Sequence, residues 1–125
     1  MNMLDMPQSS STPLIRFDLA ERKMRISGES YPENSFGFYA PVFDWVKEYL
    51  AGADELHLDI DISYMNSSST KCVLDLLDLL EDAHARGAKV DIVWRYDTEN
   101  PRSLDLAEEF QEEVTLPFSI VAATE

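Results

Sequence analysis

Cysteine is nearly absent from this chain, in which Cys72 is the only one among 125 residues. A single cysteine excludes an internal disulfide and a C-x-x-C zinc site. The four glycines are scattered, so the sequence lacks the glycine-rich loops that bind dinucleotides and phosphates. It also lacks an apolar run near the ~18 residues of a membrane span, and its start, MNMLDMPQSS, is unlike a signal peptide. These absences predict a cytoplasmic protein that requires no cofactor.

Positive charge is scarce, with 10 basic residues against 24 acidic ones and a net charge of −14. Residues 1–30 hold four basic and four acidic residues, so the whole excess lies on residues 31–125. Such a surface repels nucleic acids and anionic membranes, and we expect neither as a partner. The acidity favours a protein partner with a basic face, or it only keeps the domain in solution. Composition leaves both explanations open.

The alternation of apolar and polar residues predicts one domain over residues 12–125, after a mobile N-terminal tail at 1–11. Strands are expected near 14–18 and 23–27, over the alternating segments 56–64 and 90–96, and in the final PFSIVAA. Because alternation is typical of a sheet with one covered face, we expect helices mainly on one side. The predicted fold is α/β, with a mixed sheet of four to five strands.

Three helices are expected between these strands, which gives the order β-β-α-β-α-β-α-β. The first follows a cap at Asn34 or Ser35 and ends at Gly52, with Pro41 either kinking it or marking where it becomes regular. The second ends before Gly87. The third starts after Pro101, with Ser103 as a possible cap.

The segment SYMNSSSTKC, residues 63–72, contains four consecutive hydroxyl residues at the turn from a strand into the second helix. A nucleophile there needs a base, but His57 and His84 are each more than about 20 Å away along the elements. One explanation is that the hydroxyls cap the helix. The other is that they carry a phosphate, which a helix N-terminus stabilises. Both fit the residues equally well.

The second helix has an apolar face and a charged face. Val73, Leu76, Leu77, Leu80 and His84 share the first, and Lys71, Asp75, Asp78 and Asp82 share the second. Leu74 breaks this pattern, because it falls on the charged side below Ser67. An apolar residue ringed by acids is typical of the centre of a small interface.

Two further groups of residues have alternative interpretations. Asp59, Asp61 and Asp91 share a polar sheet face and match the oxygen ligands of Mg²⁺ or Ca²⁺, although a solvated sheet face is the favoured interpretation. Cys72 lies in the first helical turn, where a thiol pKa can fall. We favour a small core residue there.

Several motifs together resemble the SiaC family of bacterial regulatory phosphoproteins. These are SYPENS (30–35), YMNSSSTK (64–71), LLDLLEDAH (76–84), AEEF (107–110) and PFSI (117–120), and the resemblance covers nearly all of residues 11–122. The order of elements and the N-S-S turn also resemble the STAS fold of sulphate-transporter tails and anti-sigma factor antagonists. The resemblance implies a STAS-like domain over residues 12–125.

The resemblance also implies a function as a non-enzymatic partner switch. In its unphosphorylated form the protein would bind and activate a diguanylate cyclase, in cyclic-di-GMP and biofilm signalling. A cognate serine/threonine kinase would phosphorylate Ser67 and block binding, and a PP2C-type phosphatase would restore it. Ser68 and Ser69 are alternates for the modified residue, since the family often has threonine at the position of Ser67. The expected partner-binding residues are Tyr64, Asn66, Ser68, Lys71, Leu74, Asp75 and Asp78. An anti-sigma factor antagonist is the alternative function.

Overall fold

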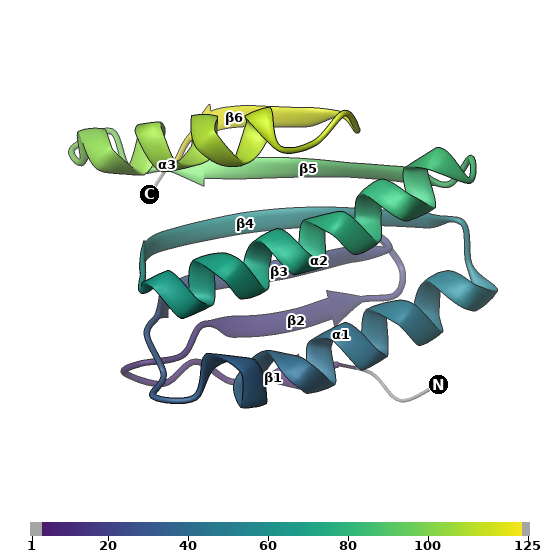
Figure 1. The fold of residues 1–125 in the computed structure, drawn as a ribbon, viewed down its shortest axis with the longest axis horizontal. Helices are drawn as coiled ribbons and strands as arrows, with labels where there is room; N and C mark the ends of the chain where they lie inside the picture. Colours follow the sequence, from purple (N-terminus) through teal and green to yellow (C-terminus); the bar gives the residue numbers. More distant parts are fainter. Residues whose placement is uncertain (1–3, 124–125) are drawn as a thin grey trace.

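A six-stranded mixed sheet forms the centre of the computed structural model, which describes residues 4–123 (Figure 1). The elements follow one another as β1 (Asp5–Met6), β2 (Leu14–Asp18), β3 (Lys23–Ser30), α1 (Ser35–Gly52), β4 (Glu55–Met65), α2 (Ser67–Ala85), β5 (Lys89–Tyr96), α3 (Pro101–Glu112) and β6 (Phe118–Ala122). The predicted α/β class is confirmed, and so is the predicted order of elements from β2 to β6. The expected four to five strands were wrong, because the two-residue β1 is too short to produce a periodic pattern.

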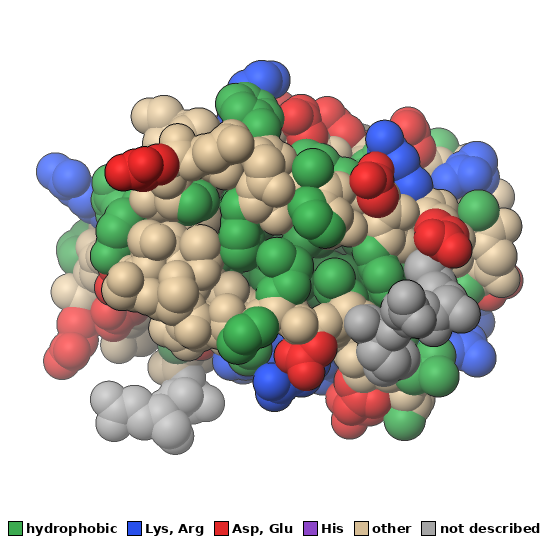
Figure 2. Space-filling model, turned by 90° about the horizontal axis from the view of Figure 1, so that it is seen from below, with side chains coloured by type: hydrophobic (Ala, Val, Ile, Leu, Met, Phe, Trp, Pro, Cys, Tyr) green, Lys and Arg blue, Asp and Glu red, His purple; other side chains and the backbone are tan. Residues whose placement is uncertain are grey.

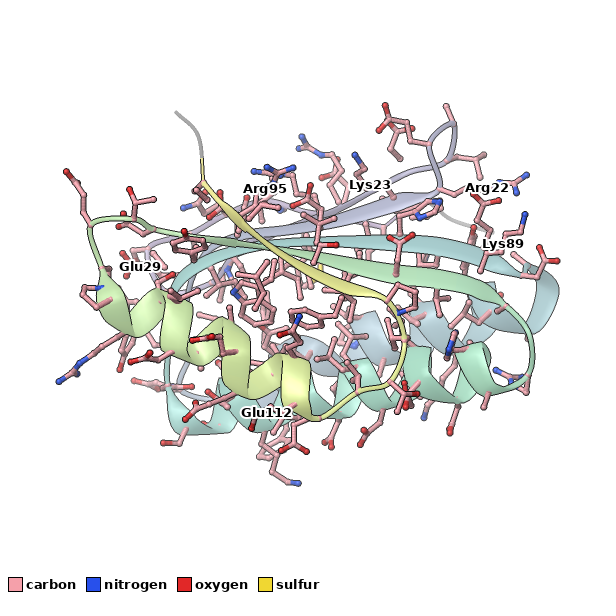
Figure 3. All side chains as sticks on the ribbon, turned by 90° about the horizontal axis from the view of Figure 1, so that it is seen from above. Arg22, Lys23, Glu29, Lys89, Arg95 and Glu112 are labelled. Carbon is pink, nitrogen blue, oxygen red and sulfur yellow. The ribbon has the colours of Figure 1, made fainter. Side chains whose placement is uncertain are left out.

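The strands lie in the sheet in the same order as in the chain, from β1 at one edge to β6 at the other. β1, β2 and β3 pair antiparallel, whereas β3, β4, β5 and β6 pair parallel. Each parallel step is a strand–helix–strand crossover through α1, α2 or α3. Because crossovers are right-handed and all three advance in the same direction, all three helices lie on one face of the sheet (Figures 1 and 3).

The alternation in β4 predicts which side of the sheet is covered. Leu56, Leu58, Ile60 and Ile62 are buried under the helices with Trp94 of β5. The polar residues between them face the other side, where Lys23 and Arg95 stand away from the helices (Figure 3). The predicted packing of helices on one face is therefore confirmed.

Part of the segment that we predicted to be a tail has a defined place in the structure. Leu4 is buried and its carbonyl accepts a hydrogen bond from Phe17 N at 3.0 Å. Asp5 forms an ion pair with Arg16 at 3.1 Å. Residues 1–3 lie outside the described residues.

When the molecule is viewed from the side of β1 and α1, hydrophobic side chains gather in a hollow that charged side chains surround (Figure 2).

The helix ends agree only partly with the expected caps. Asn34 caps α1, and Gly87 adopts a φ of 96° directly after the end of α2, as predicted. Asn100, and not Ser103, caps α3, because the Ser103 hydroxyl instead accepts a hydrogen bond from Asp97 N. Helix α1 begins at Ser35 and ends at Gly52, as predicted, and Pro41 lies inside it, so Pro41 does not mark where the helix begins.

Candidate functional site

Ser67 is the first residue of α2 and its side chain is exposed. The cap of this helix is Asn66, whose Oδ1 accepts a hydrogen bond from Ser69 N at 2.8 Å. Among the residues that the structure describes, the Ser67 hydroxyl has no hydrogen-bond partner. The first turn of α2 contains no acidic side chain. The positive end of the helix dipole at Ser67 is therefore open to an added anion.

Ser69, by contrast, is fully buried in a cluster of hydroxyl groups. Its Oγ accepts a hydrogen bond from the Ser30 hydroxyl at 2.8 Å and lies 3.1 Å from Ser35 Oγ. The Ser30 hydroxyl also lies 2.8 Å from the Tyr39 hydroxyl, and burial raises the pKa of Tyr39 to about 12. These hydroxyls fasten the start of α2 to the end of β3 and the start of α1.

Ser68 and Thr70 are half-buried and bonded locally. The Ser68 hydroxyl lies 3.4 Å from Ser35 Oγ and 3.5 Å from Asn66 Oδ1. The Thr70 hydroxyl donates to the carbonyl of Asn66 at 3.0 Å. The four hydroxyls therefore differ in role: within the described residues, Ser67 is exposed and unbonded, whereas Ser68, Ser69 and Thr70 form hydrogen bonds. Neither explanation based on the sequence alone, capping or phosphate, made this division.

Three exposed aromatic side chains lie on the elements that meet at Ser67. Tyr64 at the end of β4 is 54% exposed, Phe36 in the first turn of α1 is 52% exposed, and Tyr31 after β3 is 40% exposed. The rings of Tyr31 and Tyr64 touch edge to face, with centroids 5.9 Å apart. Tyr64 was an expected binding residue, whereas Tyr31 and Phe36 were not among the residues expected from the sequence. The motif SYPENS (30–35) contains Tyr31, and Phe36 directly follows it.

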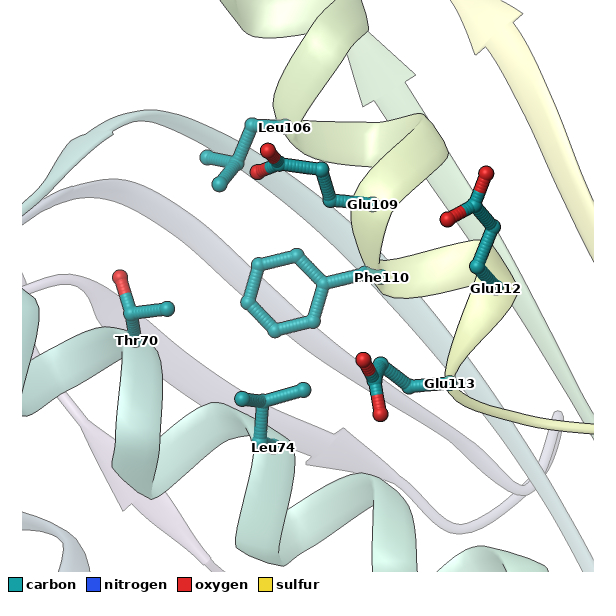
Figure 4. A pocket seen from close by; sticks show the side chains of 7 residues that line it. All are labelled: Thr70, Leu74, Leu106, Glu109, Phe110, Glu112 and Glu113. Carbon is teal, nitrogen blue, oxygen red and sulfur yellow. The ribbon is translucent and has the colours of Figure 1, made fainter.

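The outer face of α2 carries the remaining expected binding residues. Lys71 and Asp78 are exposed, and Asp75 is half-exposed. Leu74 is not on the open charged side as its place in the sequence suggested. It is half-buried and lines a groove whose other wall is α3 (Figure 4). The pattern of polar and apolar residues along α2 does not show that α3 lies on the other side of Leu74.

The carboxylates on the open sheet face are paired with arginines. Asp59 is 4% exposed and receives hydrogen bonds from Arg95 at 3.0, 3.1 and 3.4 Å, while Arg25 lies 3.3 Å away. Arg25 also pairs with Asp61 at 3.6 Å. A hydrogen bond of 2.8 Å joins His57 Nδ1 to the carboxylate of Asp91. Within residues 4–123, no group of three or more candidate ligands is arranged to hold a metal ion.

Cys72 is completely buried, and burial raises the pKa of its thiol. The structure therefore supports the favoured interpretation of a small core residue over that of a reactive thiol. His57 has both ring nitrogens bonded to carboxylates on the open sheet face. Among the described helices, none is long and apolar enough to cross a membrane.

Comparison with known proteins relates the whole chain to one family. A family model described as "SiaC family regulatory phosphoprotein" matches residues 6–123. An uncharacterized protein of Pseudomonas aeruginosa strain UCBPP-PA14 is 44% identical over 126 residues, covering 100% of both chains. The crystal structure of apo-SiaC from Pseudomonas aeruginosa superposes with a TM-score of 0.92, at 43% identity, and covers 98% of this chain and 100% of that one.

A second solved structure includes a partner. It contains the diguanylate cyclase SiaD in complex with its activator SiaC, both from Pseudomonas aeruginosa. The matching chain has a TM-score of 0.91 and 44% identity, over 96% of this chain and 99% of that one. The backbone on which Ser67, Tyr64 and Asn66 stand is thus shared with a protein that binds and activates a cyclase.

Proposed function

Because this chain belongs to the SiaC family of regulatory phosphoproteins, we propose that it is a non-enzymatic phospho-switch for a diguanylate cyclase. When Ser67 is unmodified, the protein binds the cyclase and activates it. When Ser67 carries a phosphate, the complex does not form. The observation that carries this proposal is the solved complex of a cyclase with a 44% identical activator.

Ser67 is the residue whose surroundings best support modification. Its hydroxyl is exposed and unbonded within the described chain, so phosphorylation breaks no internal contact there. A phosphoryl group adds about −1.5 to −2 charge, which the N-terminus of α2 stabilises. Ser68 is half-buried, and Ser69 is fully buried and hydrogen-bonded to other hydroxyls. Ser67 is therefore the proposed site of phosphorylation and Ser68 is its alternate, whereas Ser69 is no longer proposed.

The aromatic residues around Ser67 explain how a phosphate opposes binding. Tyr31, Phe36 and Tyr64 form an apolar rim that a partner covers when it docks. Covering this rim removes water from Ser67 as well. Burying a dianion there without a matching cation costs several kcal/mol, which is enough to abolish a typical complex. The switch acts at the contact itself and requires no change of fold.

Two enzymes complete the cycle in this proposal. A cognate serine/threonine kinase adds the phosphate to Ser67, and a PP2C-type phosphatase removes it. The hydrogen bond from Ser69 N to Asn66 Oδ1 keeps the start of α2 in place in both states, so both enzymes meet the same exposed hydroxyl or phosphate. The cell compartment in which this cycle runs is the cytoplasm, and its output is cyclic-di-GMP and biofilm control. The domain that carries it is STAS-like.

Binding and activity of Ser67 variants test this function. We would measure the affinity and cyclase activation of wild type, Ser67→Ala and Ser67→Asp, using the diguanylate cyclases of the source bacterium and SiaD of Pseudomonas aeruginosa. Ser67→Ala should bind and activate constitutively, whereas Ser67→Asp should bind at least tenfold more weakly. Glu48→Gln, an exposed change on α1, serves as the control variant. If no cyclase binds the wild type, or if Ser67→Asp binds as well as the wild type, the proposal is wrong.

Capture of partners from the source cell separates the two client classes. A cyclase among the captured proteins supports this function, whereas an anti-sigma kinase would replace it with the function of an anti-sigma factor antagonist. Intact-mass and peptide mass spectrometry of the native protein locates the phosphate among Ser67 and its neighbours.

A further inference from the structure

The groove between α2 and α3 is a second feature of the surface, and its lining contains neither Ser67 nor the exposed aromatic residues near it. It encloses about 290 Å³. Its lining consists of Thr70 and Leu74 from α2 with Leu106, Glu109, Phe110, Glu112 and Glu113 from α3 and its end (Figure 4). The floor is apolar and the rim on the α3 side is acidic.

The floor of the groove is rigid. Phe110 is buried and stacks on the fully buried Trp94, with centroids 4.6 Å apart. Glu81 of α2 fastens the segment after α3, because its carboxylate accepts hydrogen bonds from the Thr115 hydroxyl at 2.7 Å and from Leu116 N at 3.1 Å. These contacts join both walls of the groove to the rest of the fold.

The rim carries uncompensated negative charge. Glu109, Glu112 and Glu113 are exposed, and within residues 4–123 none of them forms an ion pair. The lining contains no Lys or Arg. The chain as a whole has a net charge of −14, so a second copy would be repelled at this site. Charge complementarity points instead to a segment with basic residues.

The groove continues toward Tyr64 of the aromatic rim. A neighbouring hollow of about 310 Å³ shares Leu106 and Glu109 with it and reaches Tyr64, which touches Tyr31. A single partner segment that runs along α3 can therefore contact the groove and the aromatic rim together. This continuity makes the groove part of the same docking surface.

We propose that the α2–α3 groove binds a segment of the partner protein that presents one large apolar side chain flanked by Lys or Arg. The apolar side chain fills the space above Phe110, between Leu74 and Leu106. The flanking cations face Glu109, Glu112 and Glu113. This inference rests on the proposed function for the identity of the partner, a cyclase, but the chemistry of the groove is testable without it.

A peptide titration followed by amide NMR shifts tests the groove directly. The probe is a short synthetic peptide with a central Leu flanked by Lys and Arg, and the controls replace the Leu by Ala or the basic residues by Glu. Shifts confined to residues 70–74 and 106–113, for the probe only, are the expected result. No shifts, or shifts scattered over the surface, would overturn the proposal. Groove shifts that appear on concentrating the protein alone would assign the site to a second copy and overturn it equally.

Charge variants provide the matched comparison. Glu109→Gln/Glu112→Gln/Glu113→Gln removes three charges from the rim, and Asp44→Asn/Glu48→Gln/Asp54→Asn removes three exposed charges at the α1 edge. Peptide affinity at low salt should fall about tenfold in the first variant and stay unchanged in the second. Equal affinities in both variants would refute the groove as the site. Neither result depends on the Ser67→Asp experiment, so the two proposals fail separately.

Discussion

Replacing Ser67 by Asp should leave the fold at least as stable as the wild type, although it should abolish partner binding. Ser67 is the first residue of α2, its hydroxyl is exposed, and the first turn of the helix holds no acid. A carboxylate at such a position interacts favourably with the helix dipole. Stability and binding should therefore change in opposite directions.

The expected gain follows from two contributions. An exposed acid in the first turn contributes about 0.3–1 kcal/mol at low ionic strength. The exposed Lys71 lies four residues later, and an acid N-terminal to a lysine at this spacing adds about 0.2–0.5 kcal/mol. A total near 1 kcal/mol corresponds to a rise in Tm of about 2–5 °C for a chain of this size.

Urea and thermal unfolding of four variants isolate the charge from the size of the side chain. Ser67→Asp is compared with Ser67→Asn at the start of α2, and Ala85→Asp with Ala85→Asn at its exposed last residue. At the start of the helix the charged variant should be the more stable of its pair, and at the end the less stable. Both differences should shrink in 1 M salt because exposed charges are screened.

A loss of more than 1 kcal/mol in Ser67→Asp relative to Ser67→Asn would refute this reasoning. It would mean that the position opposes an anion. Weak cyclase binding by Ser67→Asp would then be explained by damage to α2 and not by a charge at the contact. If Ser67→Asp lost this stability while the Ala85 pair behaved as expected, the reasoning from the helix dipole would fail only at Ser67.

Three other changes test the framework around the site. Asp59→Asn should cost about 1.5–3 kcal/mol in urea unfolding, because the charged acceptor of Arg95 is lost, and a change below 0.5 kcal/mol would contradict this. Ser69→Ala should cost about 1–3 kcal/mol because it leaves buried hydroxyls without a partner, whereas Ser67→Ala should be near neutral. The pKa of His57 is raised, chiefly by its hydrogen bond to a neighbouring glutamate. Its stabilising contribution should be complete below the ordinary histidine pKa and should be lost as the pH rises through the raised one. Stability of His57→Gln measured from pH 5 to 9 should lack this decline, and an identical decline would contradict the assignment.

Much of the fold follows from local patterns that the sequence states directly. The alternation in residues 56–62 shows which apolar side chains of β4 are buried, although the pattern fails at Tyr64, which is 54% exposed. Gly87 marks the end of α2 because few other residues accept its positive φ. β1 has only two residues, and its pairing with β2 depends on the neighbouring strand and not on its own pattern. The cap of α3 was misplaced because Asn100 and Ser103 are both suitable, and only their surroundings separate them.

The sequence by itself determined the order of elements, the covered face of the sheet and the presence of a hydroxyl-rich helix start, because each depends on residues that are neighbours in the chain. Only the tertiary structure decided that Ser67 is exposed while Ser69 is buried, since β3 and α1 cover one side of that helix start. It also decided that Leu74 lines a groove, because α3, which comes later in the chain, forms the other wall. Burial depends on which distant segments meet, and no local pattern contains that information.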